Sequence, residues 1–274
     1  MHVHLIGVAG TGMSALAALL GQRGYRVSGS DTSFDPPVGP YLESIGIECM
    51  RGWDAANLDT SPDLVVVGNV CRKDNPEAKE ASRRGIRTVS MPTALADEVL
   101  STRTPLVIAG THGKTTTTAL TAYLLQSVGV DAGFFVGGLP LNFERSSVLG
   151  AEGQPFVIEG DEYDSAFFEK TPKFWHYHPA SAIITSIEYD HVDIYPNEDV
   201  YLDAFRKFVA QIPSDGWLFA WAGHPNVRAA AKAAQCRLRF YALDDDDCGD
   251  IQPMWLGMVA PGGTMDLFGG GSLC

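Results

Sequence analysis

Residues 110–117, Gly-Thr-His-Gly-Lys-Thr-Thr-Thr, combine glycines, a lysine and hydroxyl side chains in an order typical of phosphate binding. Glycines let backbone N–H groups close around anionic oxygens, and a lysine supplies positive charge for the outer phosphates of a nucleotide. Thr115 follows Lys114 directly and is placed to ligate Mg²⁺. The usual P-loop pattern has its first glycine where this chain has Ile108, so the loop is a shortened variant. The predicted phosphate-binding residues are Gly110, Thr111, His112, Gly113, Lys114, Thr115 and Thr116.

The residues on both sides of this loop predict the elements that position it. Residues 106–109 form an apolar run typical of a buried strand, and the apolar residues within 119–126 recur at helical spacing. A strand, a glycine loop and a helix in this order place backbone N–H groups and the positive end of the helix dipole at the phosphates. The alternative is a threonine-rich helix cap with an exposed lysine, which the flanking strand and helix disfavour.

Two clusters of carboxylates follow other apolar runs. Residues 156–158 lead into Glu159-Gly-Asp-Glu-Tyr-Asp, and residues 182–185 lead into a segment that contains Glu188, Asp190, His191 and Asp193. Ligands of open α/β sheets bind at the carboxyl ends of the strands, so we expect these loops to converge on the phosphate loop. Carboxylate oxygens suit Mg²⁺, and a site that holds ATP needs only one or two of them from the protein. For any single carboxylate, the alternative is a solvated loop residue.

The N-terminus carries a second glycine turn. Residues 3–6 predict a strand, Gly7-Val-Ala-Gly-Thr-Gly a turn, residues 14–23 a helix, and residues 25–28 a strand that leads to Asp31. This is the start of a dinucleotide-type βαβ unit, in which Asp31 could accept a ribose hydroxyl. The glycines are spaced G-x-x-G-x-G, so the match to an NAD fingerprint is loose. The alternative is a turn that serves only tight packing of the strand against the helix.

Strands and helices alternate along the chain, which predicts an α/β fold with parallel sheets. In the first part we expect strands at residues 47–50, 64–67 and 86–90, and helices at 41–45, from Pro76 onward with Asn75 as its cap, and at 93–100. Residues 101–105 are polar and end in proline, so they are predicted to link a Rossmann-like domain, 1–100, to a P-loop domain, 106–274.

Composition limits the classes of partner. The formal charge of −13 and the pI near 4.8 argue against nucleic acid as a ligand. The five cysteines are never spaced Cys-x-x-Cys, which indicates reduced thiols, and no apolar stretch is long enough for a membrane span. We therefore expect a cytoplasmic protein without a membrane partner, and make no prediction of its oligomeric state.

Two further groups could suggest a metal. The run from Asp244 to Asp247 is predicted to be a solvated turn, because consecutive carboxylates do not converge. His176 and His178 resemble a zinc pair, but without a cysteine or third ligand nearby we expect ordinary packing or a wall of a substrate site.

Taken together, the motifs resemble those of the Mur ligases, which build the peptidoglycan stem peptide. The resemblance rests on the phosphate loop, on Glu159-Gly-Asp-Glu-Tyr-Asp and on Asp190-His-Val-Asp, in that order after a glycine-turn βαβ domain. Residues 68–77, 137–144, 161–168 and 173–177 resemble the murein-recycling members most. Those members join UDP-N-acetylmuramate to the tripeptide L-alanyl-γ-D-glutamyl-meso-diaminopimelate.

The resemblance implies an ATP-dependent amide ligation through an acyl phosphate. By the family's pattern, the catalytic residues are Lys114 on the outer phosphates of ATP, Glu159 with Thr115 on a first Mg²⁺, and His191 on a second. Histidine is an unusual Mg²⁺ ligand, so this last role rests on resemblance alone. The family's pattern also implies a UDP-sugar site formed by Gly10, Thr11, Gly12, Met13, Ser14, Asp31 and Asn69.

The C-terminus departs from the family. Residues 264–274 resemble the middle of a β-hairpin region of the central domain, and the family's third domain, which binds the incoming peptide, is not recognisable. The sequence therefore predicts a truncated ligase. Three alternatives stay open: a catalytically incomplete UDP-sugar and nucleotide-binding module, a muramate–L-alanine ligase, and a nicotinamide oxidoreductase, which would leave the phosphate loop unexplained.

Overall fold

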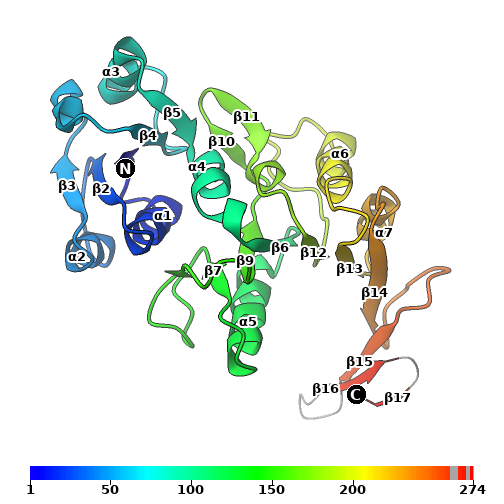
Figure 1. The fold of residues 1–274 in the computed structure, drawn as a ribbon. Coiled ribbons are helices and arrows are strands. Elements are labelled where there is room, and N and C mark those ends of the chain that lie inside the picture. The colour runs from blue at the N-terminus through cyan, green and yellow to red at the C-terminus, as the bar shows by residue number, and fades with distance from the viewer. Residues whose placement is uncertain (260–264, 270–271, 274) are drawn as a thin grey trace.

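The computed structural model describes residues 1–259, 265–269 and 272–273, and shows two α/β domains side by side (Figure 1). The first domain has a five-stranded parallel sheet in the order β3-β2-β1-β4-β5. Its strands are β1 (His2–Ile6), β2 (Arg26–Asp31), β3 (Glu48–Arg51), β4 (Leu64–Val67) and β5 (Arg87–Ser90). Its α-helices are α1 (Thr11–Gln22), α2 (Val38–Ser44), α3 (Pro76–Arg84) and α4 (Met91–Glu98). The predicted Rossmann-like sheet is confirmed, and the turn after β1 lies where the strand order reverses.

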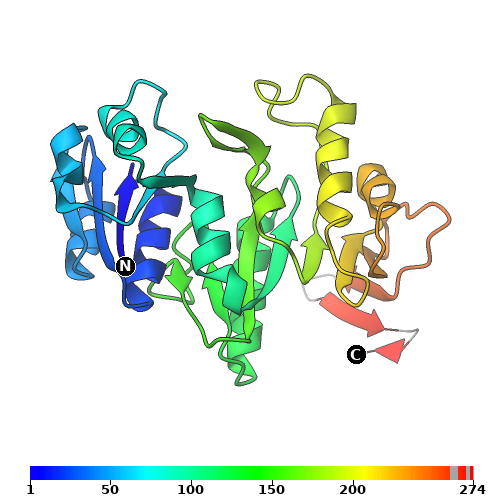
Figure 2. The same cartoon turned by 45° about the horizontal axis from the view of Figure 1, so that its top comes forward.

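The second domain has a ten-stranded sheet in the order β17-β16-β15-β14-β13-β12-β6-β9-β7-β8. Figure 2 shows the two domains from a second direction. The strands from β14 to β7 pair in parallel, and β15 pairs in parallel with β14. The strands are β6 (Thr104–Ala109), β7 (Gly133–Phe135), β8 (Ser147–Val148), β9 (Pro155–Gly160), β12 (Ser181–Ile184), β13 (Trp217–Trp221), β14 (Arg237–Leu243), β15 (Trp255–Val259), β16 (Met265–Gly269) and β17 (Ser272–Leu273). The helices are α5 (Lys114–Ser127), α6 (Glu198–Val209) and α7 (Pro225–Ala231), and a separate hairpin comprises β10 (Asp164–Ala166) and β11 (Glu169–Pro172).

Local sequence signals account for several element boundaries. The Asn75 side chain accepts hydrogen bonds from the backbone N–H groups of Glu77 and Ala78, and Pro76 occupies the first turn of α3, as predicted. The same helix ends at Gly85, which has a φ of +67°. β6 begins at Thr104, within the predicted linker.

The segment that joins the two domains is fixed by Arg103, which is 9% exposed. Its guanidinium donates to the carbonyl oxygens of Val99, Leu149 and Gly150 at 2.7 to 3.0 Å. The Ser147 hydroxyl of the second domain also donates to the Ala15 carbonyl of α1 at 3.1 Å. These contacts join the domains through buried polar groups as well as through a shared apolar core.

A buried polar network that the sequence did not predict lies beneath the first sheet. The Glu77 carboxylate, at the start of α3, is completely buried. It accepts hydrogen bonds from the Ser30 hydroxyl at 2.6 Å and from the Asn57 amide at 2.7 Å, and lies 3.1 Å from His4 Nε2. The other ring nitrogen of His4 is 2.9 Å from the Ser28 hydroxyl. This network ties β1, β2 and α3 together around one carboxylate.

Two C-terminal predictions have separate outcomes. The acidic run begins as a turn after β14, as predicted, but Asp246 is more than a solvated residue. Its carboxylate accepts from Trp221 Nε1 at 2.6 Å and from the Leu243 N–H at 2.7 Å. Of residues 264–274, positions 264, 270, 271 and 274 lie outside the described residues, and the rest form β16 and β17. Within the described ranges, no helix combines the length and apolarity needed to cross a membrane.

Candidate functional site

A cavity of about 410 Å³ lies between the two domains, where several strand-end loops meet. The first domain contributes Thr11 and Gly12 from the turn after β1, and Met91 from the start of α4. From the second domain, the phosphate loop contributes Thr111 and Lys114, and the two acidic loops contribute Glu159, Asp161, Tyr163, Asp190 and His191. Phe135 and Gly137 at the end of β7, and Lys173 and Tyr177 after β11, complete the lining. The predicted convergence of the phosphate loop with both acidic clusters is therefore observed.

The phosphate loop is held against the end of β12. Gly110 has a φ of +137°, and a methyl group added there would lie 2.8 Å from the Ser186 carbonyl oxygen. Thr185 donates its hydroxyl to the His112 carbonyl at 2.6 Å, and Ser186 accepts the His112 N–H at 3.1 Å. Gly113, with a φ of +77°, precedes α5, whose first residue is Lys114. The loop conformation thus depends on a glycine that packs against a neighbouring strand end.

We predict that Gly110→Ala disrupts this loop. The added methyl group meets backbone atoms of Ser186, and the left-handed conformation is strained for alanine, at a cost on the order of 1–3 kcal/mol. Binding of an ATP analogue, measured by isothermal titration calorimetry, should weaken at least tenfold. Gly129→Ala is the matched control: it also has a positive φ, but no atom lies within 4 Å of the added methyl group. Equal affinity in the two variants would show that the packing of Gly110 is not required.

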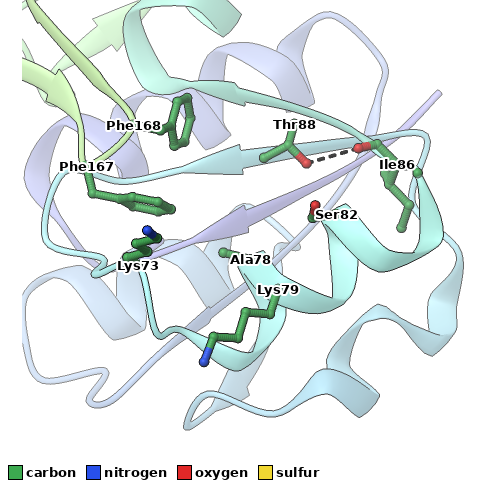
Figure 3. A pocket seen from close by; sticks show the side chains of 9 residues that line it. Lys73, Ala78, Lys79, Ser82, Ile86, Thr88, Phe167 and Phe168 are labelled. Carbon is green, nitrogen blue, oxygen red and sulfur yellow. Dashed lines mark hydrogen bonds between the residues drawn. The ribbon is translucent and has the colours of Figure 1, made fainter.

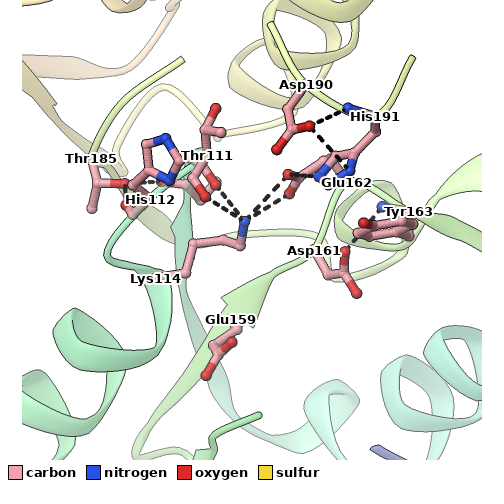
Figure 4. Close-up of polar contacts among 12 residues, drawn as sticks. Thr111, His112, Lys114, Glu159, Asp161, Glu162, Tyr163, Thr185, Asp190 and His191 are labelled. Atoms are coloured by element: carbon pink, nitrogen blue, oxygen red, sulfur yellow. Dashed lines mark hydrogen bonds and ion pairs between the residues drawn. The ribbon is translucent and has the colours of Figure 1, made fainter. Parts of the chain in front are cut away.

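Lys114 is oriented by acceptors in the loop and in the first acidic cluster (Figure 4). Its Nζ donates to the Gly110 carbonyl at 2.6 Å, to the Thr111 carbonyl at 3.3 Å and to Glu162 Oε2 at 3.0 Å. The lysine side chain is 17% exposed and faces the cavity lining. Its positive charge therefore lies at the phosphate loop, where it is paired with the Glu162 carboxylate.

Glu159 forms a second polar group with Thr115. Glu159 Oε2 accepts the Thr115 hydroxyl at 3.1 Å, and Oε1 accepts the Gly137 N–H at 2.7 Å. Burial raises the pKa of Glu159, and hydrogen bonds from Gly137 and Thr115 and the charge of Lys114 oppose that rise. A divalent cation would neutralise this half-buried carboxylate, and the oxygen donors present are those that Mg²⁺ prefers. A methyl group on Gly137 would lie 3.0 Å from Glu159 Oε2 and would crowd this place.

His191 lies at the end of the second acidic loop and lines the same cavity. Its φ of +58° is unusual for a non-glycine residue, and the Asp190 carboxylate accepts its backbone N–H at 2.7 Å. Its ring centroid is 4.1 Å from that of Tyr163. Among the described residues, no group of three or more His, Cys, Asp or Glu side chains could hold a metal.

Three residues of the first acidic segment and its surroundings line or support the cavity without having been predicted as site residues. Glu162 is completely buried and lies 3.0 Å from both Lys114 Nζ and His191 Nε2. Lys173 Nζ donates to Asp161 Oδ2 at 2.6 Å, which places a second lysine at the cavity. The sequence showed Asp161 and Glu162 only as members of a carboxylate run, and gave no sign of which side chains turn inward.

The predicted UDP-sugar residues are only partly brought together. Thr11 and Gly12 line the cavity, whereas Met13 and Ser14 are buried and the Ser14 hydroxyl donates to the Thr11 carbonyl. Gly10 N–H donates to the Gly7 carbonyl and so closes the turn. This turn can therefore offer backbone N–H groups, but not the side chains of residues 13 and 14.

Asp31 and Asn69 lie at the same sheet edge but do not line the cavity. Asp31 Oδ2 accepts the Ala9 N–H at 3.0 Å, and Oδ1 accepts the Thr32 N–H at 2.7 Å. Both carboxylate oxygens thus fix backbone turns. Asn69 is exposed in the turn after β4.

Other residues that the sequence singled out do not line this cavity. His112 is largely exposed and 3.4 Å from Glu188, and Thr116 is exposed on the first turn of α5. The two ring nitrogens of His176 lie 3.3 and 3.0 Å from the hydroxyls of Thr93 and Thr171, so this residue packs against threonines.

A separate hollow of about 640 Å³ contains none of the predicted site residues (Figure 3). It is lined by Lys73, Ala78, Lys79, Ser82, Gly85, Ile86, Thr88, Phe167 and Phe168.

Comparison with known families matches both domains. Residues 2–102 match the catalytic domain of the Mur ligase family, and residues 108–258 match the Mur ligase middle domain. The UDP-N-acetylmuramate–L-alanyl-γ-D-glutamyl-meso-2,6-diaminoheptandioate ligase of Escherichia coli K12 is 43% identical over 216 residues, 79% of this chain and 47% of that protein. The UDP-N-acetylmuramate–L-alanine ligase of Rubrobacter xylanophilus is 37% identical over 243 residues, 89% of this chain and 52% of that protein. The chain spans about half the length of the curated relatives it matches.

Solved structures agree with this match. The crystal structure of the UDP-N-acetylmuramate:L-alanyl-γ-D-glutamyl-meso-diaminopimelate ligase from Neisseria meningitides superposes with a TM-score of 0.91 at 34% identity. The match covers 99% of this chain and 85% of that chain. A UDP-N-acetylmuramate–alanine ligase from Thermotoga maritima shares the fold, with a TM-score of 0.75 at 24% identity over 94% of this chain and 54% of that one.

Proposed function

The chain belongs to the Mur ligase family, and we propose on this basis that it carries the two substrate-binding domains of an ATP-dependent amide ligase. The substrates proposed are UDP-N-acetylmuramate and the tripeptide L-alanyl-γ-D-glutamyl-meso-diaminopimelate. One observation carries the proposal: a single cavity joins the glycine turn of the first domain to the phosphate loop of the second. An acyl phosphate can form only where the carboxylate of one substrate meets the outer phosphate of the other.

Each side of this cavity has a proposed role. The N–H groups of Thr11 and Gly12 bind the UDP diphosphate, and those of the phosphate loop bind ATP. Lys114 leaves the carbonyl oxygens of Gly110 and Thr111 and donates to the outer phosphates. Thr115 and Glu159 would hold Mg²⁺, and His191 would hold a second ion. Cations bound there would neutralise the phosphate charge that develops during transfer. Asp31 supports the UDP side indirectly, because it fixes the turn through Ala9.

The proposed reaction has two steps. The substrate carboxylate attacks the γ-phosphate, so that a carboxylate–phosphorus bond forms and ADP leaves. The amine of the peptide then attacks the acyl carbon, loses a proton and displaces inorganic phosphate. The described residues of the cavity act in the first step by positioning and by charge neutralisation, which is where such phosphoryl transfers gain most of their rate.

The choice of tripeptide over L-alanine as the acceptor rests on the comparison with relatives. The tripeptide ligases of E. coli and Haemophilus influenzae are 43% and 38% identical to this chain, and the L-alanine ligase of R. xylanophilus is 37% identical. The 34% identity and TM-score of 0.91 for the N. meningitides structure also favour the tripeptide. An L-alanine ligase is the second candidate.

Equilibrium binding tests the proposal. We expect isothermal titration calorimetry to detect both UDP-N-acetylmuramate and a non-hydrolysable Mg·ATP analogue, and no NAD. Mass spectrometry of mixtures with ATP and either acceptor then tests catalysis, with the tripeptide amide as the expected product. Binding of both ligands without an amide or ADP would support the binding-module alternative. Binding of NAD in place of UDP-N-acetylmuramate would contradict the proposal.

A further inference from the structure

We propose that Glu162 is a positioning residue for this chemistry: it fixes the His191 ring with Nε2 protonated and Nδ1 free. Glu162 lies in the loop between β9 and β10 and touches no solvent. The inference rests on the proposed function, because it concerns how His191 is presented to a phosphate or its cation.

The partners of Glu162 come from the phosphate loop, from the segment after β12 and from α6. Oε1 lies 3.0 Å from His191 Nε2, and Oε2 lies 3.0 Å from Lys114 Nζ. The Tyr195 hydroxyl donates to the Glu162 carbonyl at 2.6 Å, and the Tyr201 hydroxyl donates to Oε1 at 3.4 Å. The phosphate loop, the first acidic loop and the segment after β12 are therefore joined at this one residue (Figure 4).

The carboxylate form follows from these contacts. A fully buried carboxylate is stable only when it is paired, and the Lys114 ammonium is the pairing cation. An ionised carboxylate is an acceptor only, so the hydrogen atom between Oε1 and Nε2 belongs to the histidine. This assigns the tautomer of His191 from its surroundings.

In the neutral imidazole, a hydrogen on Nε2 leaves the other ring nitrogen, Nδ1, with a free electron pair. Nδ1 has Asp190 Oδ1 at 3.8 Å and, among the residues that the structure describes, no hydrogen-bond partner. Carboxylates that bind one ring nitrogen of a histidine commonly orient the other nitrogen toward a cation and raise its basicity. Since His191 lines the cavity, Nδ1 is the ring atom assigned to the reacting groups.

A glutamine could not replace Glu162. One amide oxygen would have to accept from both Lys114 and His191, and the amide NH₂ would then face donors. If the amide instead donated to Nε2, the hydrogen on the ring would shift to Nδ1. Either arrangement removes the constraint that fixes the tautomer of the His191 ring. Because glutamine is nearly the same size as glutamate, Glu162→Gln tests the charge and acceptor capacity of the side chain without changing its size.

Long-range ¹H–¹⁵N NMR of the chain labelled with ¹⁵N-histidine tests the assignment directly. His191 signals are identified by their loss in His191→Gln. We expect a protonated Nε2 and an unprotonated Nδ1 in the ligand-free wild-type chain, and a mixed or reversed pattern in Glu162→Gln. Asp164→Asn is the matched control, because Asp164 is a nearby carboxylate that pairs with Lys170, and it should leave the His191 signals unchanged.

A wild-type spectrum with hydrogen on Nδ1, or on both nitrogens, would overturn the inference without any variant. As a second measurement, the Mg²⁺ concentration needed to bind an ATP analogue should rise about 10- to 100-fold in Glu162→Gln. An unchanged Mg²⁺ requirement in a folded variant would also overturn it. If the wild-type tautomer is as expected but no nucleotide binds, the proposed function fails instead, and the two failures are thereby distinguished.

Discussion

Lys114→Ala should reduce the affinity for Mg·ATP analogues by on the order of 100-fold, about 2.7 kcal/mol, and leave the affinity for UDP-N-acetylmuramate nearly unchanged. Lys114 is the lysine that contacts the phosphate-loop carbonyls, and the UDP-sugar residues lie in the other domain. Isothermal titration calorimetry with each ligand separately measures both affinities. Any ATP turnover should disappear with the nucleotide affinity.

The control for Lys114→Ala must distinguish the loss of a positive charge at the phosphate loop from the change in the net charge of the protein. Lys170→Ala removes the same charge from an exposed residue that pairs with Asp164, and should leave both affinities unchanged. Removal of Lys114 also leaves Glu162 without its cation, so thermal unfolding of the variant must be measured alongside. Equal loss of both ligands in a folded variant would contradict the assignment of two separate sites.

Glu77→Ala is expected to lower the free energy of unfolding by about 3–5 kcal/mol. The carboxylate is fully buried, and its removal leaves Ser30, Asn57 and His4 without their shared acceptor. A cavity adds to this loss. Urea denaturation followed by circular dichroism gives the free energy directly.

Glu80→Ala provides the comparison on the same helix. Glu80 bonds Arg83 and Arg84 at the surface, and those bonds hold its pKa low, at about 2. Because these are surface ion pairs, the variant should unfold close to the wild-type urea concentration. A Glu77 variant as stable as the Glu80 variant would show that the buried network contributes little.

The sequence predicted the architecture because its signals are local. The apolar runs, the glycine turns and the Asn75-Pro76 start of α3 each predict their own element. Parallel strand order then brings the loops after β6, β9 and β12 to one edge, which is why the convergence at Lys114 could be predicted.

The part of the site that the sequence did not predict depends on which side chains point into the protein interior. Glu159 and Glu162 lie three positions apart in one carboxylate run, yet only the structure shows that Glu162 is the buried partner of Lys114 and His191. Glu77 followed the pattern of a first-turn carboxylate that complements the helix dipole, but it is the centre of a buried network. Asp31 resembled a ribose acceptor, and the structure adds that its two oxygens accept the N–H groups of Ala9 and Thr32. No repeating pattern in the sequence indicates any of these roles.

The central claim is that the sugar nucleotide and ATP meet in the cavity between the domains. Its most direct test uses Mn²⁺ bound together with a non-hydrolysable ATP analogue. The measurement is the paramagnetic relaxation that this Mn²⁺ causes in the lactyl methyl protons of UDP-N-acetylmuramate. Our account predicts strong broadening of the methyl signal in the ternary complex, and its loss in Lys114→Ala. Saturating binding of both ligands without such broadening would place the two sites apart and contradict the account.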